Sequence, residues 1–267
     1  MKTTAKLATV ACAVMLASTL QGCGGSAETK SNFDGVDVSQ PVTDWVMVWN
    51  DEFDGAAINS NKWNYEINCA GGGNNEKQCY TDNSENAFVK DGVLNIVALP
   101  AEEGAEKPYT SARLTTQHKA DFKYGRFEMR AKLPYGQGSW PAFWMMGKNG
   151  DWPARGEVDI MEWFGAQFTG QPNQVQSAVH TTFNHWGSAA GLLYAKRNVA
   201  NMCSEFHLFQ LHWTANEILI GVDGATTFSY KKPANAGTDK WPFDQPAHIL
   251  LNVAVGGNLG GAVDLAK

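Results

Sequence analysis

The feature that most constrains the fold of this chain is a two-residue repeat of apolar side chains, which continues from Trp45 onward. In residues 125–133 (GRFEMRAKL), apolar and charged side chains alternate strictly, and this pattern predicts a strand with one face buried. Residues 206–213 (FHLFQLHW) show the same period with more apolar residues. No segment beyond residue 40 has a long 3.6-residue apolar period, so we expect an all-β domain without helices.

Two Asp-Gly pairs place hairpins in this all-β chain. Asp91-Gly92 separates an apolar run at 87–89 from one at 93–99, and Asp223-Gly224 lies between residues 217–222 and 225–230. Asp-Gly tolerates the positive φ angles that two-residue hairpin turns require. Many strands, short turns and no internal repeat predict a single domain, either a two-sheet sandwich or a barrel.

Residues 1–22 have the features of a secretory signal peptide. Lys2 and Lys6 precede an apolar run from Leu7 to Leu20, which is too short to cross a bilayer as a permanent helix. The run ends in Leu-Gln-Gly-Cys, which resembles a bacterial lipobox, where the Cys is lipidated and becomes the first residue of the mature chain. We therefore expect an exported protein.

Cys23 is the residue that a lipid would modify. Lipidation there would anchor the protein to a membrane that it does not cross, at the bacterial outer membrane or cell surface, with simple secretion as the alternative. Residues 23–40 are polar and patternless, so we expect them to form a flexible tether. The remaining residues, 41–267, are expected to form the folded domain.

Charge and composition exclude several kinds of partner. Removing residues 1–22 takes away two lysines and no acid, so the formal net charge becomes −8 in place of −6. An acidic chain without basic runs is a poor candidate for binding nucleic acid or other polyanions. The 10 Trp and 13 Phe residues instead suit an aromatic binding surface on a turn-rich β protein. We expect a monomer.

The cysteines permit one disulfide in the folded domain. Cys69 and Cys79 flank a Gly-rich loop, and an exported protein could join them, which would leave Cys203 unpaired. Alternatively, free buried cysteines would behave as small apolar residues. No CxxC pair and no HExxH motif is present, so a zinc site is not expected.

The segment that carries chemistry is Gly156–Trp163, with the sequence GEVDIMEW. On a regular strand, Glu157 and Asp159 share a face, whereas Glu162 points to the opposite one. A single bulge near residues 160–161 would absorb one residue and return Glu162 to the first face. The strand would then present three acids on one face while Val, Ile and Met pack into the core.

Acids clustered in this way repel one another, so their pKa values separate. One carboxylate can remain ionised as a nucleophile while another stays protonated as an acid, which is the division that retaining glycosidases need. The alternatives are a calcium site or a solvated edge strand. Calcium loops contain glycine and asparagine rather than Val-Ile-Met filling, so catalysis is the favoured interpretation.

The segment matches the ExDxxE signature of glycoside hydrolase family 16, and it resembles the laminarinase-type endo-β-1,3-glucanases of that family. Other landmarks of the family occur in the expected order and cover roughly residues 45–264: WNDEFDG (49–55), NNE (74–76), CYT (79–81), TSAR (110–113), YGRFE (124–128), WPAFWM (140–145) and LNVAVGGN (251–258). The resemblance implies a β-jelly-roll sandwich of two antiparallel sheets with a concave substrate cleft.

The resemblance also implies roles for the three acids. Glu157 is expected to be the nucleophile, Glu162 the acid/base, and Asp159 to assist between them. The extra residue before the second Glu distinguishes this type from lichenase-like members with ExDxE, in agreement with the predicted bulge.

Several residues are candidates for binding sugar, because polysaccharide sites combine flat aromatic faces with hydrogen-bonding side chains. Trp140 and Trp144 are four residues apart in an extended segment, so both can face the cleft, and Trp140 is the favoured platform. The resemblance places Arg113 and Asn74 in the negative subsites. His180 alternates with apolar residues in a strand and is expected either to line the cleft near the acid/base or to be structural.

The resemblance also sets expectations about metal and substrate. Members of the family usually continue into one further strand with an Asp tied to a structural calcium; this chain shows no counterpart, so the calcium site is not carried over and no cofactor is expected. Laminarin-type β-1,3-glucan is the expected substrate, with mixed-linkage β-1,3-1,4-glucan as a side activity. The alternatives are a β-agarase or other galactan hydrolase, and a non-catalytic glucan-binding protein.

Overall fold

The structure is a computed structural model that describes residues 8–13, 45–165 and 173–264. Cys23, the predicted tether and most of the predicted signal peptide lie outside the described residues. In the described part of the chain, no helix is long and apolar enough to cross a membrane.

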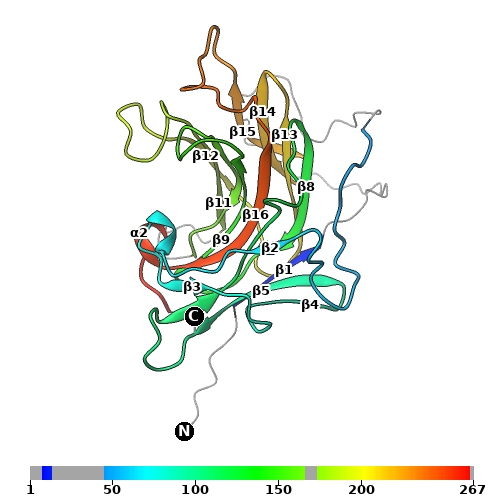
Figure 1. Cartoon of the computed structure of the whole chain (residues 1–267), viewed down its shortest axis with the longest axis vertical. Helices are drawn as coiled ribbons and strands as arrows, with labels where there is room; N and C mark the ends of the chain where they lie inside the picture. The colour runs from blue at the N-terminus through cyan, green and yellow to red at the C-terminus, as the bar shows by residue number, and fades with distance from the viewer. Residues whose placement is uncertain (1–7, 14–44, 166–172, 265–267) are drawn as a thin grey trace.

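The described chain forms two sheets that pack face to face (Figure 1). The strand order across the nine-stranded sheet is β15 (Ala225–Lys231), β14 (Glu217–Val222), β13 (His207–Trp213), β8 (Gly125–Lys132), β1 (Ala8–Ala13), β5 (Val93–Pro100), β6 (Tyr109–Ser111) and β3 (Gln78–Tyr80), with β4 (Ala87–Lys90) paired to β5. The order across the seven-stranded sheet is β12 (Leu193–Asn198), β11 (Gln174–His180), β10 (Glu157–Glu162), β9 (Ser139–Gly147), β16 (Ala247–Val255), β7 (Arg113–Thr115) and β2 (Asn64–Tyr65). Every pairing is antiparallel except that of β3 with β6. The prediction of a two-sheet jelly-roll sandwich is confirmed.

Apolar side chains from both sheets meet in one core between the two layers. Phe209 and Leu211 of β13 and Val253 of β16 are fully buried there. The alternating segment 125–133 contributes its apolar residues to this core and is the half-buried strand β8 that the sequence predicts. Burying each such large side chain stabilises the fold by about 1.5–3 kcal/mol.

Both predicted hairpins are present. Asp91 and Gly92 have φ angles of 53° and 72° and join β4 to β5. Asp223 and Gly224, at 51° and 79°, join β14 to β15. Positive φ at both central residues is the geometry that matches the twist of the flanking strands.

Two short helical turns lie together at one end of the seven-stranded sheet, as Figure 1 shows. They are η1 (Gly71–Gly73) and α2 (Gly257–Gly260), and the Asn258 N–H donates to the Asn74 carbonyl at 2.7 Å. A disulfide joins Cys69 to Cys79 next to η1, and Cys203 is free.

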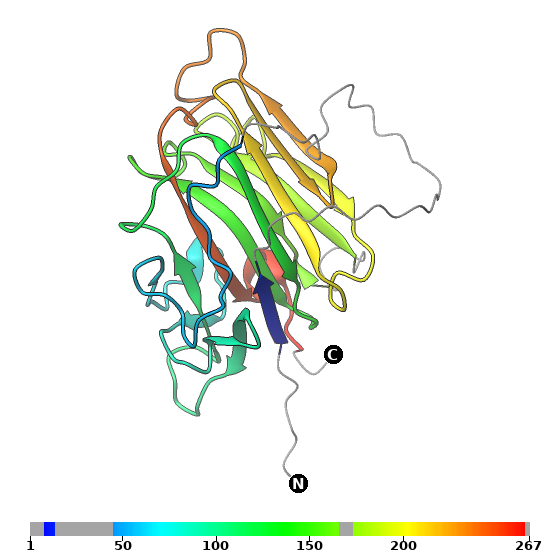
Figure 2. The same cartoon turned by 90° about the vertical axis from the view of Figure 1, so that its right-hand side faces the viewer.

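Strand β1 lies between β5 and β8, dark blue in Figure 2, and falls within the predicted signal peptide. It pairs with β8 only at residues 130–132. Beside residues 125–129 there is an apolar hollow of about 600 Å³, bounded by the segment 45–53 and reaching the core side chains of Phe143 and Leu251. This hollow opens on the inner face of the seven-stranded sheet, so it is separate from the site described next.

Candidate active site

Strand β10 presents its three acids on one face through a bulge, as the sequence predicts. Asp159 pairs with Trp144 of β9, and the next pairs are Met161 with Phe143 and Glu162 with Ala142. The register shift falls after Asp159, so one extra residue of β10 is accommodated there. The Val, Ile and Met side chains between the acids lie in the core. We call the opposite face of the seven-stranded sheet, which carries Glu157, Asp159 and Glu162, the acid-bearing face.

Each acid has its own hydrogen-bonding environment. Glu157 accepts a hydrogen bond at Oε2 from the Trp152 indole N–H at 2.6 Å. Glu162 accepts from the Trp140 indole N–H at 3.0 Å and from the Gln176 amide at 3.4 Å. These donors stabilise the ionised form of each glutamate.

Asp159 lies between the two glutamates and is 3% exposed. His180 Nε2 is 3.1 Å from Asp159 Oδ2, and β11 places His180 directly opposite Glu157. His180 therefore lies on the acid-bearing face, as one of its two predicted positions requires, and adjoins Asp159 and Glu157.

The pKa values of all three carboxyl groups lie above their ordinary range. Burial raises the pKa of Glu157 to about 8, and the charge of Asp159 adds to this. Burial raises the pKa of Glu162 to about 7, against the lowering effects of His180 and the Trp140 hydrogen bond. Burial and the charge of Glu162 raise the pKa of Asp159. At neutral pH Glu157 is therefore mainly protonated and donates a hydrogen bond to Asp159, and Glu162 is close to half protonated.

The raised pKa of Glu157 predicts how stability depends on pH. A carboxyl group with a raised pKa binds its proton more tightly in the folded state, so its contribution to the free energy of unfolding is lost as pH rises from about 4.5 to about 8. We expect Glu157→Gln, which has no proton to lose, to be more stable than the wild type at pH 8 by about 1–2 kcal/mol. Thermal melts of both proteins should show a difference of several degrees at pH 8 that shrinks toward pH 5. A difference in melting temperature that grows as the pH falls would contradict a raised pKa at Glu157.

Two groups of three described residues bring possible metal ligands together. One is Cys69, Cys79 and Glu106, in which both sulfurs are already joined in the disulfide. The other is Glu157, Asp159 and His180, whose nearest ligand atoms lie within 4.8 Å of one another. Calcium takes six to eight oxygen ligands, and this second group supplies an imidazole and few oxygens, so it does not fit the family's calcium.

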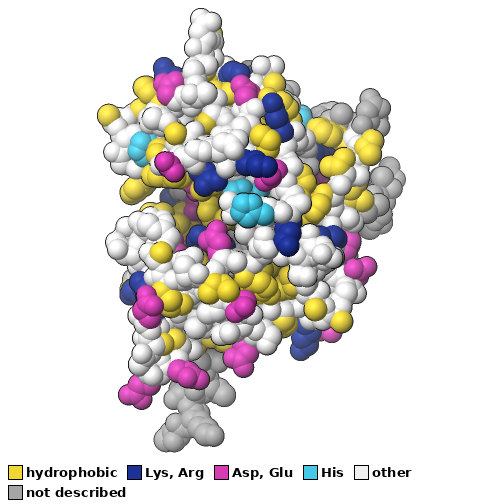
Figure 3. Space-filling view, in the orientation of Figure 1, with side chains coloured by type: hydrophobic (Ala, Val, Ile, Leu, Met, Phe, Trp, Pro, Cys, Tyr) yellow, Lys and Arg dark blue, Asp and Glu magenta, His cyan; other side chains and the backbone are white. Residues whose placement is uncertain are grey.

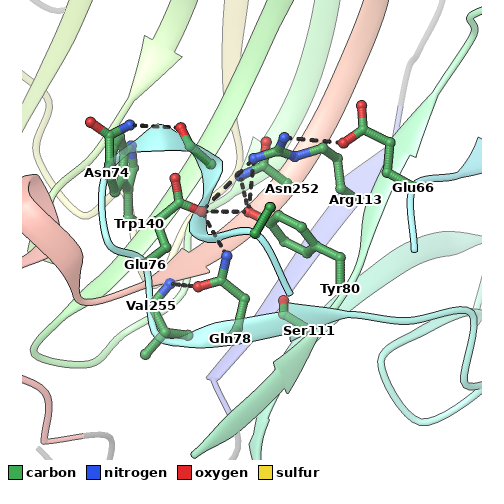
Figure 4. Close-up of polar contacts among 12 residues, drawn as sticks. Glu66, Asn74, Glu76, Gln78, Tyr80, Ser111, Arg113, Trp140, Asn252 and Val255 are labelled. Atoms are coloured by element: carbon green, nitrogen blue, oxygen red, sulfur yellow. Dashed lines mark hydrogen bonds and ion pairs between the residues drawn. The ribbon is translucent and has the colours of Figure 1, made fainter. Parts of the chain in front are cut away.

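A polar network lies on the same face, on the side of β10 where β16 and β7 are found (Figure 4). Its centre is the Tyr80 hydroxyl, which donates to Glu76 Oε2 at 3.3 Å. The Tyr80 hydroxyl oxygen also accepts hydrogen bonds from the Arg113 guanidinium and from the Asn252 amide, each at 3.2 Å. Asn252 in turn accepts from the Trp144 indole N–H at 2.7 Å. The network therefore fixes Arg113 and Trp144, two of the predicted sugar-binding residues, relative to one another.

Arg113 remains cationic in this network. Burial opposes its charge, but the neighbouring Tyr80, Glu66 and Glu76 side chains raise its pKa. The guanidinium lies 4.4 Å from the Tyr80 ring and 5.3 Å from the Trp144 ring, and Glu66 pairs with it at 3.1 Å. A rigid guanidinium beside an aromatic face can fix the hydroxyl groups of a sugar.

The two predicted tryptophans differ in exposure. Both point to the acid-bearing face, but Trp140 is only 5% exposed, because Phe164, Ala254 and Leu259 pack around it. Trp140 thus acts as a donor to Glu162, and the more open ring is Trp144. This reverses the preference for Trp140 as the platform.

The Gly-rich turn η1 is closely packed over the network. A Cβ atom on Gly72 would collide with the Glu76 carboxylate, and one on Gly257 would lie 2.6 Å from the Asn74 carbonyl oxygen. Both glycines have positive φ, so a side chain there would also strain the backbone. Asn74 is held at this rim by its carbonyl, and its side-chain amide donates to the Gly72 carbonyl at 3.3 Å.

Sequence reasoning missed three residues of this site. Trp152 is 47% exposed, and its indole N–H donates to Glu157. Glu76 and Asn252 stood within family landmarks, but nothing in their spacing predicted the shared Tyr80 hydroxyl. A carboxylate three residues after Gly-Gly-Gly and an Asn in an apolar strand are the signals that could have indicated buried polar roles.

A β-sandwich that carries three carboxyl groups on one sheet face, beside an aromatic and guanidinium surface, is typical of a glycoside hydrolase. The chain belongs to glycosyl hydrolase family 16: the family model "Glycosyl hydrolases family 16" matches residues 73–264.

Named relatives agree with this assignment. The chain is 41% identical over 242 residues to a beta-glucanase of Rhodothermus marinus, covering 85% of this chain and 81% of the relative. It is 38% identical over 235 residues to a glucan endo-1,3-beta-glucosidase of Cryptopygus antarcticus, covering 81% and 83%. The solved laminarinase of Rhodothermus marinus superposes with a TM-score of 0.77 at 39% identity, covering 83% of this chain and 91% of that one.

Proposed function

We propose that this enzyme hydrolyses internal linkages of β-1,3-glucan, such as laminarin, with retention of anomeric configuration. The observation that carries the proposal is the bulge in β10, which places Glu157 and Glu162 on one face, each with its own indole donor. The beta-glucanase and endo-1,3-beta-glucosidase relatives support the choice of substrate. Mixed-linkage β-1,3-1,4-glucan is proposed as a side activity.

In the first step of this mechanism, a Glu157 carboxylate oxygen bonds to the anomeric carbon while Glu162 gives its proton to the leaving glycosidic oxygen. Glu157 must be ionised to attack, so the reactive form of the site is the one in which Glu157, with its pKa of about 8, has lost its proton. In the second step, the Glu162 carboxylate takes a proton from water as the water oxygen bonds to the anomeric carbon and Glu157 departs.

Surface charge favours a neutral polysaccharide. On the face drawn in Figure 3, Lys and Arg side chains lie scattered among Asp and Glu rather than in one basic patch. Sulfated galactans would be bound best by a cluster of cations. Neutral agarose is the remaining galactan alternative.

The reaction is tested by incubating the purified domain with laminarin and following the anomeric protons of the products by NMR. We expect β-anomer oligosaccharides first, which then drift to the equilibrium mixture, because two displacements at one carbon retain its configuration. Initial α-anomer would contradict the roles of Glu157 and Glu162. A folded protein that yields no product from laminarin but cleaves agarose would contradict the substrate.

We also propose that the protein is exported and anchored through a lipid on Cys23, as the lipobox-like sequence indicates. Expression with a radiolabelled fatty acid should label the wild type, which should sediment with membranes. Cys23→Ser should carry no label and lose membrane association, while Cys203→Ser should behave as the wild type. Equal labelling of both variants would contradict the anchor.

A further inference from the structure

The register of the seven-stranded sheet aligns side chains in rows across the acid-bearing face. One row runs from Arg113 through Asn252, Ala142, Glu162 and Gln176 to Lys196, because each pairs with the next across neighbouring strands. A second row contains Trp144, Asp159, Ala178 and Tyr194. Residues that pair directly across strands point to the same face. Tyr194 and Lys196 of β12 therefore point to the same face as the acids.

Packing fixes this orientation of β12. Its alternate residues Leu193 and Ala195 pack against the core, so Tyr194 and Lys196 are directed outward. Tyr194 is 52% exposed, and the Lys196 ammonium lies 5.9 Å from the centre of its ring. β12 is the edge strand opposite β2.

The two ends of the rows lie on opposite sides of the acids. Arg113 and Trp144 lie toward β7, whereas Tyr194 and Lys196 are two strands beyond β10, roughly 10 Å from Glu162 at a spacing of about 4.8 Å per strand. Between them stands Gln176, which contacts the Glu162 carboxylate at 3.4 Å. A glucan crossing the strands at Glu157 and Glu162 would thus contact β7 and β16 with one part and β11 and β12 with the other.

We propose that β12 carries a sugar-binding subsite on the leaving-group side of the cleavage point, with Tyr194 as the stacking platform and Lys196 as a donor to hydroxyl groups. Because Arg113, a predicted negative-subsite residue, lies on the other side of the acids, the ligand on β12 is a glucosyl unit on the reducing-end side of the bond that breaks. An aromatic ring stacks on the C–H face of a sugar, and an ammonium close to the ring can donate to the oxygens of that sugar. This inference rests on the proposed function.

The test separates the two sides of the site by substrate. Laminarin places glucosyl units on both sides of the acids, whereas an aryl glycoside of a β-1,3-linked gluco-oligosaccharide has an aryl leaving group and no sugar over β12. We expect Tyr194→Ala to lower kcat/KM on laminarin about 3- to 10-fold, and to change activity on the aryl glycoside by less than about twofold. Tyr194→Phe keeps the ring and should retain wild-type activity on both, and Lys196→Met should follow Tyr194→Ala with a smaller loss.

Phe206→Ala is the matched control, because this aromatic residue lies just before β13 of the other sheet, with Arg130 4.3 Å from its ring. It should leave both activities unchanged. An active wild type whose Tyr194→Ala variant keeps full activity on laminarin, or loses both activities equally, would overturn the inference alone. A folded wild type that cleaves neither substrate would overturn the proposed function, and the inference with it.

Discussion

Replacing Glu157 with Gln is expected to reduce hydrolysis of laminarin by roughly 10³-fold or more, while the protein still folds and binds glucan. The amide cannot attack the anomeric carbon, so the covalent step is lost. Binding should persist, because Arg113 and Trp144 are held by Tyr80 and Asn252 and not by Glu157. Initial rates, with laminarin binding measured by calorimetry, check both halves of the expectation.

The matched variant is Gln176→Ala, which removes a long contact to Glu162 and leaves Glu157 in place. It should keep most of the activity. A Glu157→Gln protein with near wild-type turnover would remove Glu157 from the covalent step. A wild-type protein that neither cleaves nor binds glucan would contradict both the proposed reaction and the proposed substrate.

The arrangement of the acids was predictable because strand parity is a strict rule. Glu157 and Asp159 share a face on any strand, and only an odd insertion can bring Glu162 back, so the ExDxxE spacing itself requires the bulge. The hairpins were predictable for a similar reason, since Asp-Gly is among the few pairs that accept positive φ twice in succession.

The ranking of the aromatic residues was not predictable, because exposure depends on what packs from elsewhere. Parity places Trp140 and Trp144 on the same face, but Phe164 and Leu259 come from other segments and cover only Trp140. His180 is a comparable case. The position of His180 in its strand determines the face of the sheet to which it points. Its contact with Asp159 depends on the pairing of β10 with β11, which the sequence does not specify.

The polar network around Tyr80 lay further beyond sequence reasoning. Its members come from five segments of the chain, and a hydrogen bond between Asn252 and Tyr80 spans 172 positions. Charge alone would suggest only its ion pairs, Arg113 with Glu66 at 3.1 Å and Arg113 with Glu76 at 3.9 Å. Buried polar groups must find partners, but sequence does not say which ones.

The second large effect is expected at Glu76, which we infer to be a positioning residue for Arg113 and Trp144. Its carboxylate is 3% exposed and accepts from the Tyr80 hydroxyl and, at 2.7 Å, from the Gln78 amide. Because Glu76 accepts the hydrogen bond that the Tyr80 hydroxyl donates, the lone pairs of the Tyr80 oxygen are free to accept hydrogen bonds from Arg113 and Asn252. In Glu76→Gln, an amide N–H₂ would face one of these donors, and a buried donor without an acceptor costs about 1–3 kcal/mol.

We therefore expect Glu76→Gln to lower kcat/KM on laminarin by about 10- to 100-fold, mainly by raising KM, because Arg113 and Trp144 are predicted to bind sugar and not to take part in bond cleavage. The control is Glu66→Gln, which removes the more exposed partner of the same guanidinium and should change kcat/KM by less than about twofold. The pH profile should not move in either variant, since neither contacts the acids, and the fluorescence of Trp144 should shift only in Glu76→Gln.

If Glu76→Gln does not fold, Tyr80→Phe removes the shared hydroxyl and should give the same rise in KM. A fall in kcat with a displaced pH profile would show instead that Glu76 acts through the three acids of β10. Equal effects of Glu76→Gln and Glu66→Gln on kcat/KM would show that Arg113 needs a nearby negative charge and not the hydrogen bond to Tyr80.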